Sequence, residues 1–152
     1  MADSRLGKMR MTRSRRRMLA GIRERDPEPL TRPRPLERRW LGNCRDFAVL
    51  LCALLRAHRR PARVRYGFAT YFAPGVNTDH VVCEVWNAED DRWRLVDPMI
   101  DDFPRAAYAI HVDTHDPPEA AFVPAGRGWQ WCREGRARPG QFGIGRRAPR
   151  GI

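Results

Sequence analysis

The hydrophobic pattern changes its period at Pro61, and this change constrains the fold more than any other feature of the sequence. Before Pro61, apolar residues recur every three to four positions across residues 44–57, which predicts a helix with Asn43 as its N-cap. After Pro61, polar and apolar residues alternate through residues 62–72, which predicts a strand. A helix followed directly by strands indicates an α+β domain.

Two further strands are predicted over residues 80–86 and 92–96, separated by a polar turn, so they should form an antiparallel hairpin. If the turn is centred on residues 88–89, His80 lies directly opposite Asp97. A register error of one residue would place the two side chains on opposite faces of the sheet. We therefore expect a helix packed on an antiparallel sheet, with His80 and Asp97 close together.

Charge and proline content divide the chain of 152 residues into three parts. Residues 1–39 form a basic Arg- and Pro-rich segment, with a predicted helix over 13–25. Residues 40–135 form the folded domain, which includes a short helix near 125–134. Residues 136–152 are expected to be a flexible basic tail.

The net charge of +11 is concentrated at the two ends of the chain. Residues 1–40 hold 13 Lys and Arg against 5 Asp and Glu, residues 41–126 hold 9 against 12, and residues 127–152 hold 7 against 1. The basic ends are either solvated tails or contacts for nucleic acid or acidic partners. The longest uncharged apolar stretch, 47–55, is too short to cross a bilayer, and we expect a cytoplasmic chain with no secretory signal.

The four cysteines show no CxxC pair, so we expect reduced thiols without a metal site or other cofactor. Cys44 stands at the first position of the predicted helix, where backbone N–H groups and the helix dipole favour a thiolate. Cys52 lies eight residues further along the helix, where a small buried side chain is the ordinary role. Cys44 is therefore the candidate nucleophile.

A thiol nucleophile requires a proton acceptor, and that acceptor requires an orienting group. His80 with Asp97 meets this requirement through the predicted hairpin. His58 stands beside two arginines at the end of the predicted helix, and His111 and His115 lie in an irregular stretch. We therefore favour a Cys-His-Asp triad of Cys44, His80 and Asp97.

These residues, in this order, resemble the transglutaminase-like superfamily, whose fold belongs with papain-like cysteine peptidases. The resemblance rests on four segments, which are Gly42-Asn43-Cys44, Pro61-Ala62-Arg63 with Gly67-Phe68, the strand that His80 opens, and Val96-Asp97-Pro98. It implies that Cys44 is the nucleophile, His80 the general base and acid, and Asp97 the orienting carboxylate. It covers about residues 40–100. Residues 122–144 also resemble the C-terminal part of longer bacterial transglutaminase-domain proteins, of which this chain would be a short or truncated member.

Three positions depart from the family pattern. Val82 stands where many members have tryptophan, and Arg60 replaces the glycine usual before Pro61. The oxyanion-hole residue upstream of Cys44 is not evident, although Trp40 is a candidate by position.

Two functions remain open. The first is cysteine-dependent acyl transfer or hydrolysis on an amide of a protein or peptide, with water or an amine as the acyl acceptor. The second is a catalytically silent transglutaminase-like binding module whose basic tails contact nucleic acid or acidic partners. Neither the substrate nor the oligomeric state follows from the sequence, and no calcium-binding loop is evident.

Overall fold

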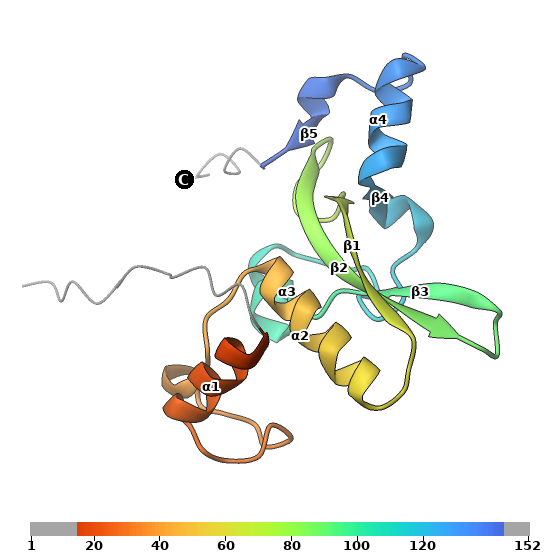
Figure 1. The fold of residues 1–152 in the computed structure, drawn as a ribbon. Coiled ribbons are helices and arrows are strands. Elements are labelled where there is room, and N and C mark those ends of the chain that lie inside the picture. Colours follow the sequence, from red (N-terminus) through yellow and green to blue (C-terminus); the bar gives the residue numbers. More distant parts are fainter. Residues whose placement is uncertain (1–14, 145–152) are drawn as a thin grey trace, which may run out of the picture. The chain divides into compact units, whose positions relative to one another are not determined.

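The computed structural model describes residues 15–144, which divide into two units after Leu41 (Figure 1). The division lies two residues beyond the predicted boundary at 39/40. The first unit contains helix α1 (Arg15–Arg25) and the 3-10 helix η1 (Leu36–Arg38). The predicted helix over 13–25 is confirmed from residue 15 onward, and its first two residues lie outside the described part of the chain.

Helix α2 (Cys44–Ala57) opens the second unit with the predicted bounds and the predicted N-cap. The Asn43 side chain accepts a hydrogen bond from the Asp46 N–H at 3.1 Å, and the Asn43 N–H donates to the Asp46 carboxylate at 3.2 Å. This reciprocal capping box satisfies two backbone donors and fixes where the helix starts. Cys44 is therefore the first helical residue.

The sheet has the order β3-β2-β1-β4, and a fifth strand, β5, pairs with β2. Its strands are β1 (Ala62–Ala69), β2 (Asn77–Asn87), β3 (Arg92–Val96), β4 (Phe122–Pro124) and β5 (Phe142–Gly143). All pairs are antiparallel except β2 with β5. In Figure 1, β3 lies near one end of the long strand β2, and β4, α4 and β5 lie near the other.

Helix α2 packs on β1 and β2 through a core of small side chains, Cys52, Ala62 and Cys83. Leucines of the helix and valines of the strands surround this core. Burial of the apolar face of α2 against the sheet stabilises this unit. The α+β fold, a cysteine-bearing helix packed on an antiparallel sheet, is confirmed.

The register of the β2–β3 hairpin differs from the predicted one by two residues. Trp86 pairs with Trp93 and Asn87 with Arg92, so four residues form the turn. The Asn87 side chain accepts from the Glu89 N–H at 3.2 Å, and Asp91 has a φ of 50°. These features lengthen the turn, because an Asx turn and a left-handed residue shift its centre towards β3.

The predicted position of His80 directly opposite Asp97 is therefore wrong. Cys83 pairs with Val96, so continuing this register by one residue puts Val82, not His80, level with Asp97. A two-residue shift preserves the face on which a side chain lies, because side chains alternate with a period of two. His80 and Asp97 thus remain diagonal neighbours on one face.

The first predicted strand is also too long, because β1 ends at Ala69 instead of continuing to residue 72. At its end β1 meets β4, and Gly67 makes this approach feasible. A Cβ atom at Gly67 would lie 2.3 Å from the Val123 carbonyl oxygen and 2.7 Å from the Phe122 ring. Only glycine fits at this position, because the backbone and the Phe122 ring of the paired strand β4 lie too close for a side chain.

Ordered structure extends beyond the predicted end of the domain at residue 135. After α4 (Ala125–Arg133), the 3-10 helix η3 (Pro139–Gln141) leads into β5. The Phe142 ring packs edge-on against Phe68, with 4.9 Å between centroids. This contact is the reason that residues 136–144 are not the predicted flexible tail, and residues 145–152 lie outside the described part.

Two short elements, α3 (Asp102–Ala107) and η2 (Glu119–Ala121), connect β3 to β4 in a region for which no helix or strand was predicted. Asp101 caps α3 by accepting the Phe103 N–H at 3.0 Å.

Among residues 15–144, no helix has the length and apolar character that a membrane span requires.

Candidate active site

His80 and Asp97 form a buried hydrogen-bonded pair. The Nε2 atom of His80 lies 2.7 Å from Oδ2 of Asp97, and the side chains are 2% and 0% exposed. Strand β2 holds His80, which is level with Gly67 of β1, and Asp97 directly follows β3. Because Nε2 contacts Asp97, Nδ1 is the ring nitrogen left to exchange a proton with a thiol.

Asp97 is fixed on both its backbone and side-chain sides. Its Oδ1 atom accepts the Met99 N–H at 3.0 Å, and its own N–H donates to the Thr114 carbonyl at 2.7 Å. The Arg105 guanidinium donates to the Thr114 hydroxyl at 2.8 Å and to the Val112 carbonyl at 3.0 Å. Arg105 thus holds the loop that in turn holds Asp97, so the carboxylate has little freedom to rotate away from His80.

Cys44, half-buried at the start of α2, lies close enough to the His80 ring to influence its pKa. Burial alone would lower the pKa of His80. Hydrogen bonds to Asp97 and Cys44, together with their charges, outweigh burial and raise the pKa of His80 to about 9. The structure therefore brings all three predicted residues together, and it favours a protonated imidazole beside the sulfur.

Tyr71 contacts the same carboxylate, and no sequence pattern predicted this contact. Its hydroxyl donates to Oδ2 of Asp97 at 2.5 Å, and its ring stands edge-on to His80 with 6.1 Å between centroids. Phe72 also packs edge-on against the His80 ring, with 5.0 Å between centroids, and against Tyr108, with 5.5 Å between centroids. In the predicted strand, Tyr71 was only an alternating apolar position, so its hydroxyl carried no signal.

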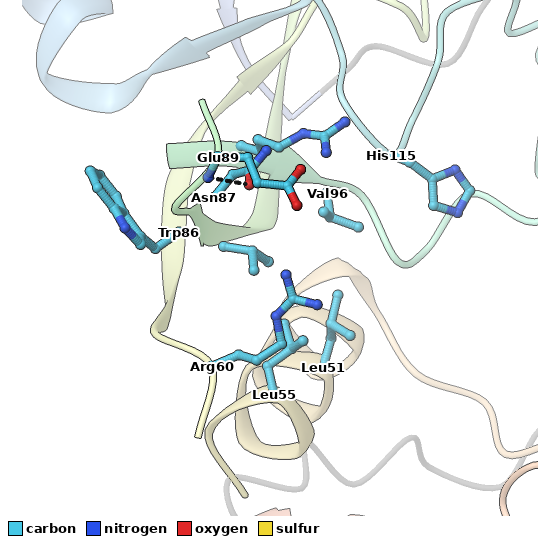
Figure 2. A pocket seen from close by; sticks show the side chains of 10 residues that line it. Leu51, Leu55, Arg60, Trp86, Asn87, Glu89, Val96 and His115 are labelled. Carbon is cyan, nitrogen blue, oxygen red and sulfur yellow. Dashed lines mark hydrogen bonds between the residues drawn. The ribbon is translucent and has the colours of Figure 1, made fainter. Parts of the chain in front are cut away.

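A separate open groove of about 430 Å³ lies at the other end of α2 (Figure 2). Leu51 and Leu55 contribute apolar surface, and the Arg60 side chain points into the groove. None of Cys44, His80 or Asp97 lines it. Leu51 and Leu55 are roughly 10–16 Å from Cys44 along the helix axis, at 1.5 Å per residue. The groove is thus distinct from the candidate active site.

All four cysteines are free thiols. Within residues 15–144, no three His, Cys, Asp or Glu side chains converge in a way that could hold a metal ion. The burial of Cys52 and Cys83 agrees with a packing role for both, and burial raises the pKa of Cys83 to about 12. Cys44 is the thiol in the described part that acts on the pKa of a histidine, His80.

Comparison with known proteins identifies the family of the chain. Comparisons with curated proteins and with solved structures found no match. The family model of the transglutaminase-like superfamily matches residues 14–98, more than half of the chain, and this range includes Cys44, His80 and Asp97. Members of this superfamily generally use cysteine-based catalysis. The chain belongs to the transglutaminase-like superfamily.

Proposed function

We propose that this protein catalyses cysteine-dependent acyl transfer from an amide of a protein or peptide. The observation that carries the proposal is the buried His80–Asp97 hydrogen bond of 2.7 Å beside the thiol that begins α2. A nucleophile, a base and a group that orients the base are the three components that such chemistry requires.

In the proposed reaction, the Cys44 thiolate attacks the amide carbonyl carbon while His80 is protonated. A C–S bond forms, and the C–N bond then breaks as the His80 imidazolium gives its proton to the departing amine. The neutral imidazole next takes a proton from water or from an acceptor amine, which attacks the thioester and releases Cys44. Water makes the enzyme a hydrolase, and an amine makes it a transglutaminase.

The backbone N–H of Cys44 is our candidate for stabilising the tetrahedral oxyanion. The Asn43 side chain accepts the Asp46 N–H, and the Asn43 carbonyl accepts the Phe47 N–H at 3.2 Å. Neither of these bonds uses the first N–H of α2, which lies at the positive end of the helix. One such donor to an oxyanion stabilises the transition state by about 2.7–4 kcal/mol. Trp40 stays a sequence-based prediction for the second donor. It belongs to the first unit, which ends at Leu41, whereas Cys44 belongs to the second unit, which begins at Gly42.

Selective alkylation tests this proposal, and the structure supplies a matched control. Cys132 on α4 is half-buried, as is Cys44, but within residues 15–144 its thiol contacts no histidine. Iodoacetamide at neutral pH should label Cys44 at least about tenfold faster than Cys132, because thiolate is the reactive form. Cys52 and Cys83 are buried and should react only on unfolding.

The substitution His80→Ala should remove the difference in rate between Cys44 and Cys132. If the two thiols react equally fast in the unmodified protein, Cys44 is not activated. That result would favour the alternative of a catalytically silent binding module.

A further inference from the structure

We propose that Tyr71 is a positioning residue that controls how tightly His80 holds its proton, by sharing the Asp97 oxygen to which His80 is bonded. This inference rests on the proposed function, since it assigns a role within the same site. Its basis is that one carboxylate oxygen, Oδ2, accepts both the Tyr71 hydroxyl at 2.5 Å and the His80 ring at 2.7 Å.

The local structure delivers Tyr71 to this position. Residue 71 comes two residues after β1 ends, and the preceding Thr70 is anchored to the segment before β4. The Thr70 N–H donates to the Ala121 carbonyl at 3.0 Å, and its hydroxyl donates to the Ala120 carbonyl at 3.1 Å. The Tyr71 ring also packs against Phe72, with 4.9 Å between centroids. The phenol therefore reaches Asp97 from a fixed backbone.

A second donor on Oδ2 changes what that oxygen offers to His80. Each hydrogen bond draws electron density from the carboxylate, so the oxygen that Tyr71 contacts attracts an imidazolium proton less strongly. The Met99 N–H occupies the other oxygen, Oδ1, at 3.0 Å, so Asp97 cannot rotate to a free oxygen without losing a bond. Tyr71 thus weakens the hold of Asp97 on the proton that His80 must give to the leaving amine.

Tyr71 remains a donor whenever the site is active. Burial, followed by the negative charge and hydrogen bond of Asp97 and the charge of Cys44, raises the pKa of Tyr71 far above its usual value. The titratable groups that act on this phenol are Asp97 and Cys44, and those that act on His80 are the same two residues. A neutral hydroxyl beside a buried carboxylate donates its proton to a hydrogen bond without ever losing it.

The test compares the full chain with its Tyr71→Phe variant, which keeps the ring and removes only the hydroxyl. The rate of Cys44 alkylation by iodoacetamide is measured from pH 5 to pH 10.5. The unmodified protein should show one step as the thiolate–imidazolium pair forms and a second, near pH 9, as His80 loses its proton. In Tyr71→Phe the second step should move up by about half a unit to one unit.

Tyr66→Phe is the matched control, since Tyr66 of β1 is 53% exposed. It should leave the second step unchanged. A paired substrate set adds a readout that packing alone would not alter, namely a p-nitroanilide and a p-nitrophenyl ester of the same acyl group. Tyr71→Phe should lower kcat/KM for the anilide about tenfold and for the ester much less, because only the amine leaving group needs the His80 proton.

If Tyr71→Phe does not fold, incorporation of 3-fluorotyrosine into a Tyr66→Phe, Tyr108→Phe background gives the opposite change, since the chain has three tyrosines. The stronger donor at position 71 should move the second step to lower pH. A second step at the same pH in the unmodified protein and in the altered one would overturn the role of Tyr71. Absence of any activation of Cys44 in the unmodified protein would instead overturn the proposed function.

Discussion

Two carboxylates, one on β2 and one just after β3, are both buried but have partners of different chemistry. Glu84 of β2 is 7% exposed and accepts hydrogen bonds from Arg65 at 2.8 and 2.9 Å and from Arg63. Asp97 is 3% exposed and accepts from His80, Tyr71 and a backbone N–H.

The difference shows that the partner, and not the burial, decides what a carboxylate can do. Burial raises the pKa of Glu84, but the two guanidiniums outweigh it and lower the pKa below its usual value. Arginine keeps its charge at every accessible pH, so this cluster is a permanent ion pair. Histidine can gain and lose a proton, so the Asp97 pair can take part in proton transfer.

The largest expected effect is that of Asp97→Asn, which keeps the shape of the side chain and removes its charge. An amide no longer stabilises the imidazolium and favours the wrong histidine tautomer, so kcat/KM should fall by about 10³ to 10⁴. The measurement is steady-state cleavage of a p-nitroanilide. Glu84→Gln, measured on the folded fraction, should leave the same rate within about twofold, and an equal loss would break the comparison between the carboxylates.

The second-largest expected effect is the change in the free energy of unfolding with pH that the His80–Asp97 pair produces. The pKa of His80 is about 9 in the folded protein and about 6.5 in the unfolded chain. The stabilisation is therefore fully present below pH 6.5 and is lost as the pH rises through 9, for a total of up to about 3 kcal/mol. Urea denaturation at pH 6 to 10 measures the free energy of unfolding as a function of pH. In His80→Gln, the decrease in this free energy between pH 6.5 and pH 9 should disappear.

Glu84→Gln should lower stability by a smaller amount. It leaves Arg63 and Arg65 facing an uncharged group, but both side chains are partly exposed, at 43% and 35%, so solvent compensates much of the loss. We expect the free energy of unfolding to fall by about 1–2 kcal/mol. Chemical denaturation at pH 7 checks this value, and a change below the measurement error would mean that the ion pair has no structural role.

The smallest effect is expected for Arg63→Lys. The Arg63 guanidinium lies 4.0 Å from the centroid of the Trp93 ring while it also contacts Glu84. Lysine keeps the charge but loses the planar stacking, so stability should fall by about 0.5–1 kcal/mol. Thermal unfolding of Arg63→Lys is compared with that of Arg92→Lys, whose partner Asp116 lies near the surface. The difference between the two changes in stability measures the contribution of the stacking contact.

The sequence was sufficient for the elements that local patterns determine. Apolar spacing and the Asn43 cap predicted α2 with its bounds, because capping and helical periodicity are local signals. Period-two alternation predicted the hairpin but not its register, since the register depends on the side-chain hydrogen bonds of Asn87 within the turn. Cys44, His80 and Asp97 could be predicted as site residues because each belongs to a recognisable local context.

The parts that were missed depend on contacts between distant segments. Tyr71 binds a carboxylate 26 residues away, and no local pattern distinguishes it from an ordinary strand tyrosine. The ordered segment 136–144 depends on Phe142 packing against Phe68, and a composition rich in Gly, Arg and Pro conceals that contact. Arg105 was likewise an ordinary charged residue until the structure showed it bound to the loop behind Asp97.

The central claim, that Cys44 acts as the nucleophile with His80 and Asp97, is tested most directly by trapping the acyl-enzyme. The protein is mixed briefly with p-nitrophenyl acetate, quenched in acid, digested and analysed by mass spectrometry. We predict one acetyl group on the peptide that contains Cys44, absent in Cys44→Ala and strongly reduced in His80→Ala. Acetylation spread over several side chains, or undiminished at Cys44 in His80→Ala, would contradict the account.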